Sequence, residues 1–192
     1  MVYAIDFIGM GASSRCKFDI VDAKESIEFI VEKIELWRKA MQIPKMHIMG
    51  HSLGGAMLGY YAIHYPHRVT KAYFVSSAGF SQGYFNRQDI EQKVNEFGFF
   101  KKILFKTAIC AWDKRYTPVY LASKMGFLRK PLLKRFLKRW DGKMTQEAKE
   151  LFSQYISALL KFSMSTDTLL LNLFDLGLKP YYPLDKGFTP NF

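Results

Sequence analysis

The 192-residue sequence lacks the features that mark several classes of protein. Its only two cysteines, Cys16 and Cys110, are far apart and fit a reducing compartment better than a disulfide framework. No uncharged apolar run approaches about 18 residues, which argues against a transmembrane helix. The opening stretch MVYAIDFIGMGA has no basic region, and Asp6 interrupts its apolar run, so it does not read as a secretory signal. Because the sequence shows no metal-ligand cluster and no phosphate-cradling glycine loop, we expect no cofactor.

What is present is enough apolar sequence for a core, with 49% hydrophobic and 16% aromatic residues, so the length suits one domain or a piece of a larger one. The first 80 residues alternate between short apolar runs and helical periodicity. Strands are predicted at Val2–Gly9, Lys45–Gly50 and Lys71–Phe80, and helices at Asp22–Gln42 and from Leu53 to just before Pro66. This alternation predicts an α/β fold with three core parallel strands and crossover helices.

The predicted secondary structure changes after Phe80. From about Asn86 to Leu178 no strand is predicted, and helices dominate, among them Gln146–Leu160 and Thr166–Leu176. The last residues, KPYYPLDKGFTPNF, contain three prolines and read as a loop. We therefore expect an α/β core at 1–82, a helical cap at 83–178 and an irregular tail at 179–192.

The cap carries the entire charge imbalance. Residues 93–143 contain 14 Lys and Arg against three acidic residues, which accounts for the net charge of +11 and favours an anionic partner. Within this segment, LRKPLLKRFLKRW (128–140) places apolar and basic residues on different faces of a predicted helix, as at an anionic membrane surface. The expected membrane or substrate contacts are Lys130, Lys134, Arg135, Phe136, Lys138, Arg139 and Trp140. FGFFKKILFKTAICAW (97–112) also combines basic with apolar residues and contains more aromatic ones.

Two other interpretations of the basic segment remain open. Most amphipathic helices pack their apolar face on a protein core and leave their lysines in solvent, and this cap could do the same. Nucleic acid is the weaker alternative, because no nucleic-acid-binding motif accompanies the basic and aromatic residues. We therefore expect no nucleic-acid partner.

The stretch KMHIMGHSLGGAML contains Gly50-His51-Ser52-Leu53-Gly54, the G-x-S-x-G pattern of a serine nucleophile on a sharp turn between strand and helix. Such a serine has a strained backbone, so its neighbours must be small. The pattern predicts Ser52 as a nucleophile and the backbone N–H of Leu53 as a donor to an oxyanion. A glycine-rich turn without chemistry is the alternative.

The stretches VYAIDFIGMGASSR, GHSLGGAMLGYYAIHYPHRV and AYFVSSAGF resemble the α/β-hydrolase fold. More narrowly, the chain is similar to the lipid-acting subfamily of N-acylphosphatidylethanolamine lipases, cardiolipin deacylase and the lipid-droplet lipase co-activator. The resemblance implies Ser52 as the nucleophile position. The co-activator branch carries Asn there, so Ser52 favours the hydrolase branches. The same subfamily carries an H-x4-D signature tied to acyltransferase activity, which none of the four histidines here completes.

A serine nucleophile requires a histidine base and an orienting acid. In this fold both follow later strands, yet the last histidine of the sequence is His67. His47 lies in the strand before the turn and His51 is adjacent to Ser52, where its side chain cannot reach back to the hydroxyl. His64 and His67 lie at the far end of the next helix. Asp6 reads as a structural acid at a strand end. In the family that the chain resembles, the loop that supplies the second oxyanion donor comes just before the strand at which this chain starts. We therefore expect a fragment or, alternatively, a short pseudoenzyme.

These observations support two functional hypotheses. The first is a serine hydrolase or acyltransferase that acts on phospholipid or N-acylphospholipid acyl groups, with the acid and histidine missing from this chain. The second is an inactive lipid- or membrane-binding module of the co-activator type, with a lipase as its partner. We expect a cytoplasmic protein that is peripheral on a membrane, lipid droplet or mitochondrion.

Overall fold

The computed structural model describes residues 1–81, 86–124, 131, 133–134, 137–159 and 165–188. The chain forms two compact units, each built from two separate segments. The first unit comprises Met1–Phe18 and Asp113–Thr168, and the second comprises Asp19–Trp112 and Leu169–Phe192. Among the described residues, no helix has the length and hydropathy needed to cross a bilayer.

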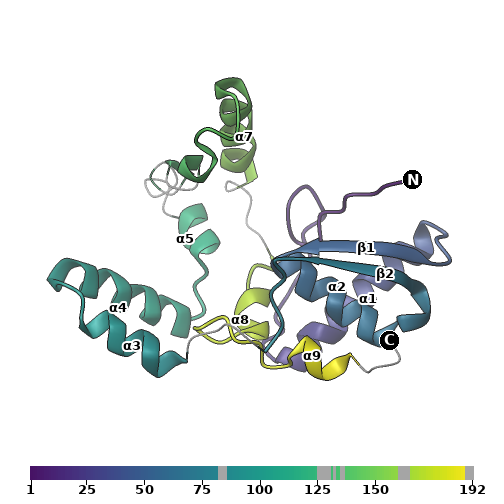
Figure 1. The fold of residues 1–192 in the computed structure, drawn as a ribbon, viewed down its shortest axis with the longest axis horizontal. Coiled ribbons are helices and arrows are strands. Elements are labelled where there is room, and N and C mark those ends of the chain that lie inside the picture. The colour runs from purple at the N-terminus through teal and green to yellow at the C-terminus, as the bar shows by residue number, and fades with distance from the viewer. Residues whose placement is uncertain (82–85, 125–130, 132, 135–136, 160–164, 189–192) are drawn as a thin grey trace. The chain divides into compact units, whose positions relative to one another are not determined.

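The second unit contains a parallel two-stranded sheet. Strand β1 (Met46–His51) pairs with β2 (Val69–Val75), and Gly50 lies opposite Phe74. Helix α2 (Leu53–His64) and the short η1 (Pro66–Arg68) connect the strands, and α2 packs on both of them. Helix α1 (Ala23–Ala40) packs on α2, on the same side of the sheet in Figure 1. The predicted strand, helix and strand order around the serine turn is therefore present.

Helix α1 follows the sequence pattern closely. The Asp22 side chain caps it by accepting a hydrogen bond from the Glu25 N–H at 2.9 Å, which satisfies a donor that the helix itself leaves unpaired. Four apolar side chains are buried: Ile27, Ile30, Val31 and Ile34. Leu36, which the periodicity placed with them, is 50% exposed, and the charged Glu35 and Arg38 are buried instead. The buried surface of α1 is therefore broader and more polar than predicted.

The prediction of a strand at Val2–Gly9 is wrong. These residues form no strand, and residues 1–6 are exposed to solvent. A strand exists only where a neighbour completes its backbone hydrogen bonds, and no described segment pairs with this one. Instead, the chain turns at Gly9 and Gly11, both at positive φ, and the Ser165 N–H donates to the Gly9 carbonyl at 3.1 Å within the first unit. Two of the three predicted strands are thus formed among the described residues.

The middle of the chain is helical where the structure describes it, as predicted. The helices are α3 (Arg87–Asn95), α4 (Phe99–Asp113), α5 (Pro118–Lys124), η2 (Lys138–Trp140), α7 (Gln146–Leu159) and α8 (Leu169–Leu173). The α7 prediction was right to within one residue, whereas α8 is shorter than the predicted helix at Thr166–Leu176. Of the predicted amphipathic helix at 128–140, residues 128–130, 132, 135 and 136 lie outside the described residues.

The tail is more ordered than its three prolines suggested. Residues Leu184–Gly187 form a short helix, α9, and Leu184 is fully buried. The Leu184 N–H donates to the Gly79 carbonyl at 2.7 Å, and the Tyr60 hydroxyl donates to the Tyr182 carbonyl at 3.0 Å. This part of the tail therefore belongs to the core beside α2 and the end of β2.

Candidate active site

Ser52 sits between β1 and α2 in a strained conformation, with φ of 51° and ψ of −122°. A non-glycine residue in such a region costs on the order of 1–3 kcal/mol, so its surroundings must hold it there. The Ser52 N–H donates to the Val75 carbonyl at 3.3 Å, and the Ser52 carbonyl accepts from the N–H groups of Ala78 and Gly55, both at 3.0 Å. Ser52 is exposed and its side chain makes no capping hydrogen bond. The strained turn expected from the motif is present, with its hydroxyl accessible.

The two glycines of the motif have different steric roles. A Cβ at Gly50 would lie 2.6 Å from the carbonyl oxygen of Gly54, closer than any side chain tolerates. A Cβ at Gly54 would have no atom within 4 Å. Gly55, just outside the motif, is tight, because its Cβ would overlap the Ser77 hydroxyl. The turn therefore requires glycine at 50 and 55 but not at 54.

The segment that follows β2 is a part of the site that the motif did not reveal. Ser76 has a positive φ of 42°, the Ser77 hydroxyl donates to the Ala78 carbonyl at 2.8 Å, and Ala78 bonds to Ser52 as described above. This turn thus closes over the serine turn from the neighbouring strand. The signal in the sequence was a pair of serines after an apolar strand, which also fits an ordinary loop.

Leu53 is the first residue of α2, so its N–H has no acceptor within the helix. Helix N-termini carry a partial positive charge, and a free N–H beside a serine hydroxyl is suited to bind a developing oxyanion. This geometry is compatible with the predicted role of Leu53, which stays a prediction.

The four histidines do not complete a triad with Ser52. His47 and His51 are exposed on β1. His64 is at the far end of α2, about 17 Å along the helix from Leu53, and its Nδ1 lies 2.8 Å from the Tyr60 carbonyl. His67 lies beyond it in η1. Asp6, in the first unit, accepts from the Ala12 N–H at 2.9 Å, which supports its structural role. Among the described residues, no hydrogen bond joins the Ser52 hydroxyl to a histidine or a carboxylate.

A second charged group in the same unit is structural. Arg38 donates to both oxygens of Glu35, at 2.7 and 2.8 Å, and the Tyr61 hydroxyl donates to Glu35 at 2.8 Å. The Arg38 hydrogen bonds lower the pKa of Glu35 to about 2, although burial opposes this. Burial, assisted by Glu35, raises the pKa of Tyr61. All three residues are at least 95% buried, so the cluster joins α1 to α2 and offers no access to substrate.

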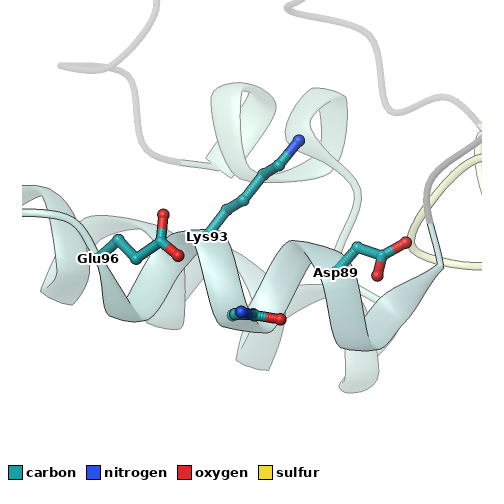
Figure 2. Close-up of a pocket in the computed structure, with 4 residues that line it drawn as sticks. Asp89, Lys93 and Glu96 are labelled. Atoms are coloured by element: carbon teal, nitrogen blue, oxygen red, sulfur yellow. The ribbon is translucent and has the colours of Figure 1, made fainter.

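The surface hollow in Figure 2 is formed by α3 alone and is lined by Asp89, Gln92, Lys93 and Glu96. Asp89 accepts from the Asn86 N–H at 3.3 Å and so helps to cap the helix. Carboxylates and an ammonium group share the hollow, and one helix face supplies all of its walls. Within the described part of the chain there is also no cluster of side chains that could hold a metal ion.

The predicted membrane contacts are only partly visible. Lys130, Arg135 and Phe136 lie outside the described residues. Lys134 and Lys138 are exposed, and Arg139 lies in η2. Trp140 is 39% exposed and packs edge-on against Phe152 of α7, with ring centroids 6.4 Å apart. Trp140 is therefore held by a neighbouring helix of the first unit.

The fold of this chain is similar to that of known proteins. The family model of the α/β-hydrolase fold matches residues 1–101. A solved 2-hydroxy-6-oxo-6-phenylhexa-2,4-dienoate hydrolase from Rhodococcus superposes with a TM-score of 0.52 and 16% identity, covering 96% of this chain and 54% of its own. At that identity the likeness concerns the fold alone.

Several curated relatives carry acyltransferase names. Over 81 residues the chain is 44% identical to human 1-acylglycerol-3-phosphate O-acyltransferase ABHD5, covering 42% of this chain and 23% of the relative. Over 191 residues it is 28% identical to a 1-acylglycerol-3-phosphate O-acyltransferase of Arabidopsis thaliana, covering 95% of this chain and 44% of the relative. The chain thus spans less than half the length of these relatives.

Proposed function

The chain belongs to the α/β-hydrolase fold family, and from this premise we propose that it acts on acyl lipids through Ser52. The family and the lipid-acting resemblance predicted from the sequence are both confirmed. The observation that carries the proposal is the conformation of Ser52, a strained and exposed serine held between a parallel strand and a helix N-terminus. The names of the curated relatives support a lipid acyl group as the substrate class.

In the proposed reaction the Ser52 hydroxyl oxygen attacks the acyl carbonyl carbon, and the backbone N–H of Leu53 binds the oxyanion. The ester C–O bond then breaks, the acyl group stays on Ser52, and the hydroxyl proton leaves on the lipid alcohol. Water or a lysophospholipid hydroxyl takes the acyl group in the second step and returns a proton to Ser52. We assign the base and its orienting acid to sequence beyond the 192 residues, because none of the four histidines bonds to Ser52.

An esterase assay tests this proposal. The 192-residue chain should hydrolyse a p-nitrophenyl ester no faster than its Ser52→Ala variant, because Ser52 lacks a base. The same chain extended with the in-frame sequence on either side should release fatty acid from phospholipid, and Ser52→Ala should lower that rate by at least about 1000-fold. Unchanged turnover in the extended Ser52→Ala protein would refute the role of Ser52. Ser52-dependent turnover by the 192-residue chain would refute the assignment of the base.

A second candidate is a peripheral membrane protein that binds acyl lipid and assists a lipase without turnover. The observation that favours it is the basic segment at 93–143, which carries all of the net charge. Flotation with anionic and with neutral vesicles tests it. Changing Lys134, Arg135, Lys138 and Arg139 to Gln should weaken binding to anionic vesicles, and unchanged binding would show that the segment 128–140 is not the contact.

A further inference from the structure

Helix α4 presents large apolar side chains to solvent. Phe99, Phe100, Ile103 and Leu104 are 72%, 85%, 49% and 65% exposed, and no residue of the helix is buried. With Thr107 and Cys110 they fall within one arc of the helix at 100° per residue, and we call these six residues the α4 apolar face. A contiguous exposed apolar face of this kind marks an interaction surface.

The opposite side of α4 makes the contacts that join the helix to the end of α3. The rings of Phe97 and Phe105 are 5.1 Å apart, and the Lys102 ammonium donates to the Asn95 carbonyl at 3.5 Å, which ties α4 to the end of α3. Ile109 and Trp112, on the same side as Phe105, are half-buried. The α4 apolar face is therefore not needed to hold the helix in place.

Basic residues border the α4 apolar face. Lys101 and Lys106 are both exposed and flank the arc on its two sides, and the Lys101 ammonium lies 5.9 Å from the centre of the Phe97 ring. Lysine stems lie along apolar surface while their ammonium groups reach for charge or water. The preceding helix, α3, exposes Arg87 and Lys93 together with Asp89 and Glu91, so its charges balance. The two consecutive helices in Figure 1 therefore differ in charge, and only α4 is suited to an anionic surface.

We propose that the α4 apolar face docks the protein on a membrane surface containing anionic lipid. Fifteen residues of helix measure about 22 Å, so α4 would lie in the plane of the interface, with its phenylalanines among the acyl chains and its lysines at the headgroups. The only hydroxyl on the face is that of Thr107, and it donates to the Ile103 carbonyl at 2.9 Å, so burying it in lipid leaves no unpaired donor. This inference rests on the proposed membrane function and is independent of catalysis by Ser52.

Cys110 provides a direct probe of the face. It is exposed on α4, whereas Cys16 is half-buried near Ser165 in the first unit. In a Cys16→Ser protein, an environment-sensitive nitrobenzoxadiazole dye on Cys110 should shift to the blue when vesicles of 30% phosphatidylserine are added. Vesicles of phosphatidylcholine alone should produce a much smaller shift. No shift with phosphatidylserine, while the protein floats with those vesicles, would overturn the proposal.

Two pairs of variants separate the apolar from the electrostatic contribution to vesicle binding. Phe100→Ser with Leu104→Ser should weaken binding at least tenfold, whereas Leu36→Ser, at the exposed leucine of α1, should not change it. Lys101→Gln with Lys106→Gln should weaken binding to anionic vesicles about fivefold per lysine, and the charge-matched pair Lys24→Gln with Lys45→Gln should have a smaller effect. Because all these side chains are exposed, circular dichroism should show unchanged folding.

The outcomes distinguish the inference from the function it rests on. If the unaltered chain does not float with anionic vesicles, the membrane function fails. If it floats and the α4 variants float equally well, the function stands and the assignment to α4 is wrong. If the phenylalanine and leucine changes instead abolish self-association measured by light scattering without lipid, the face binds a second copy and the proposal is overturned.

Discussion

At the scale of single residues, Ser52 is held by its neighbours rather than by its own preferences. Serine avoids positive φ, yet four backbone hydrogen bonds, to Val75, Ala78, Gly55 and Ala56, fix it at 51°. Two of these partners come from the end of β2 and its exit, so the conformation of the serine depends on the pairing of both strands. A change that loosens this pairing should disturb Ser52 even without touching it.

Gly50 provides the sharpest test of this packing. Gly50→Ala should destabilise the protein by roughly 2–4 kcal/mol, because its methyl group would collide with the backbone of Gly54 and Gly55. The matched control is Gly54→Ala, which meets no atom and replaces a helical glycine, so it should be neutral or stabilise by up to about 1 kcal/mol. Urea unfolding followed by circular dichroism measures both. Equal loss in the two variants would contradict the steric account.

The sequence predicted part of the candidate site because one part of it is local. G-x-S-x-G carries the strained turn within five residues, so Ser52 and the N-terminus of α2 could be placed from the pattern. Ser76 and Ala78 could not, since their role depends on the neighbouring strand and their residue types suit many loops. The pattern also could not show that Gly54, although part of the motif, has open space where a Cβ would lie.

At the scale of elements, the cluster of Glu35, Arg38 and Tyr61 joins α1 to α2. Buried ion pairs contribute little against well-packed apolar side chains, but removing one partner leaves an unpaired buried charge. Arg38 also donates to the Ile43 carbonyl and so reaches the chain just before β1. The cluster thus links two helices and the approach to the strand that ends at the serine turn.

We expect Glu35→Gln to destabilise the second unit by roughly 3 kcal/mol, because Arg38 would lose its buried counter-charge. The control is Glu32→Gln, whose carboxylate contacts Lys33 at 3.2 Å and is 60% exposed, so its loss should cost no more than about 0.5 kcal/mol. Thermal unfolding at pH 7 compares the two. Similar midpoints for both variants would show that the buried pair contributes no more than the surface pair.

The same carboxylate predicts a pH dependence. The pKa of Glu35 is lowered from 4.5 to about 2 in the folded protein, so its stabilisation is complete above pH 4.5 and is lost as pH falls through 2. The full effect is on the order of 3 kcal/mol, and most of it disappears between these two values. Glu35→Gln should lack this part of the acid sensitivity. Identical acid-unfolding curves for the two proteins would exclude Glu35 as the titrating group.

Helices could be predicted where apolar residues recur at helical spacing and a capping residue marks the start. Asp22 and the spacing of isoleucines located α1 to within two residues at each end, and α7 was located as well. Val2–Gly9 failed because an apolar run indicates burial, whereas a strand also needs a partner for its backbone. α9 was missed because four residues between prolines carry no periodicity, and its place is set by the pocket that Leu184 fills.

At the scale of the whole molecule, both units join segments that are distant in sequence. In the first unit the Thr166 hydroxyl donates to the Ile8 carbonyl at 2.8 Å. In the second, the residues after Leu169 return to α1, α2 and the end of β2, where Asn172 bonds to Ser26 at 2.7 Å. Neither unit can therefore be complete until residues more than 140 positions apart have met, and contacts at the end of the chain should control the stability of its beginning.

Leu184 tests this dependence. Its side chain lies so close to Gly59 of α2 and to Gly79 that a Cβ on either glycine would come within 3 Å of it. Leu184→Ala should leave a cavity that neither glycine can fill and should cost about 2–5 kcal/mol in the free energy of unfolding. Leu36→Ala, at a leucine that is 50% exposed, should cost much less.

Urea midpoints of the two variants measure the difference. A cost for Leu184→Ala no greater than that of the control would mean that the tail is not part of the core. A large cost, together with loss of protection from hydrogen exchange in α2, would show that the tail stabilises the helix that begins at the serine turn.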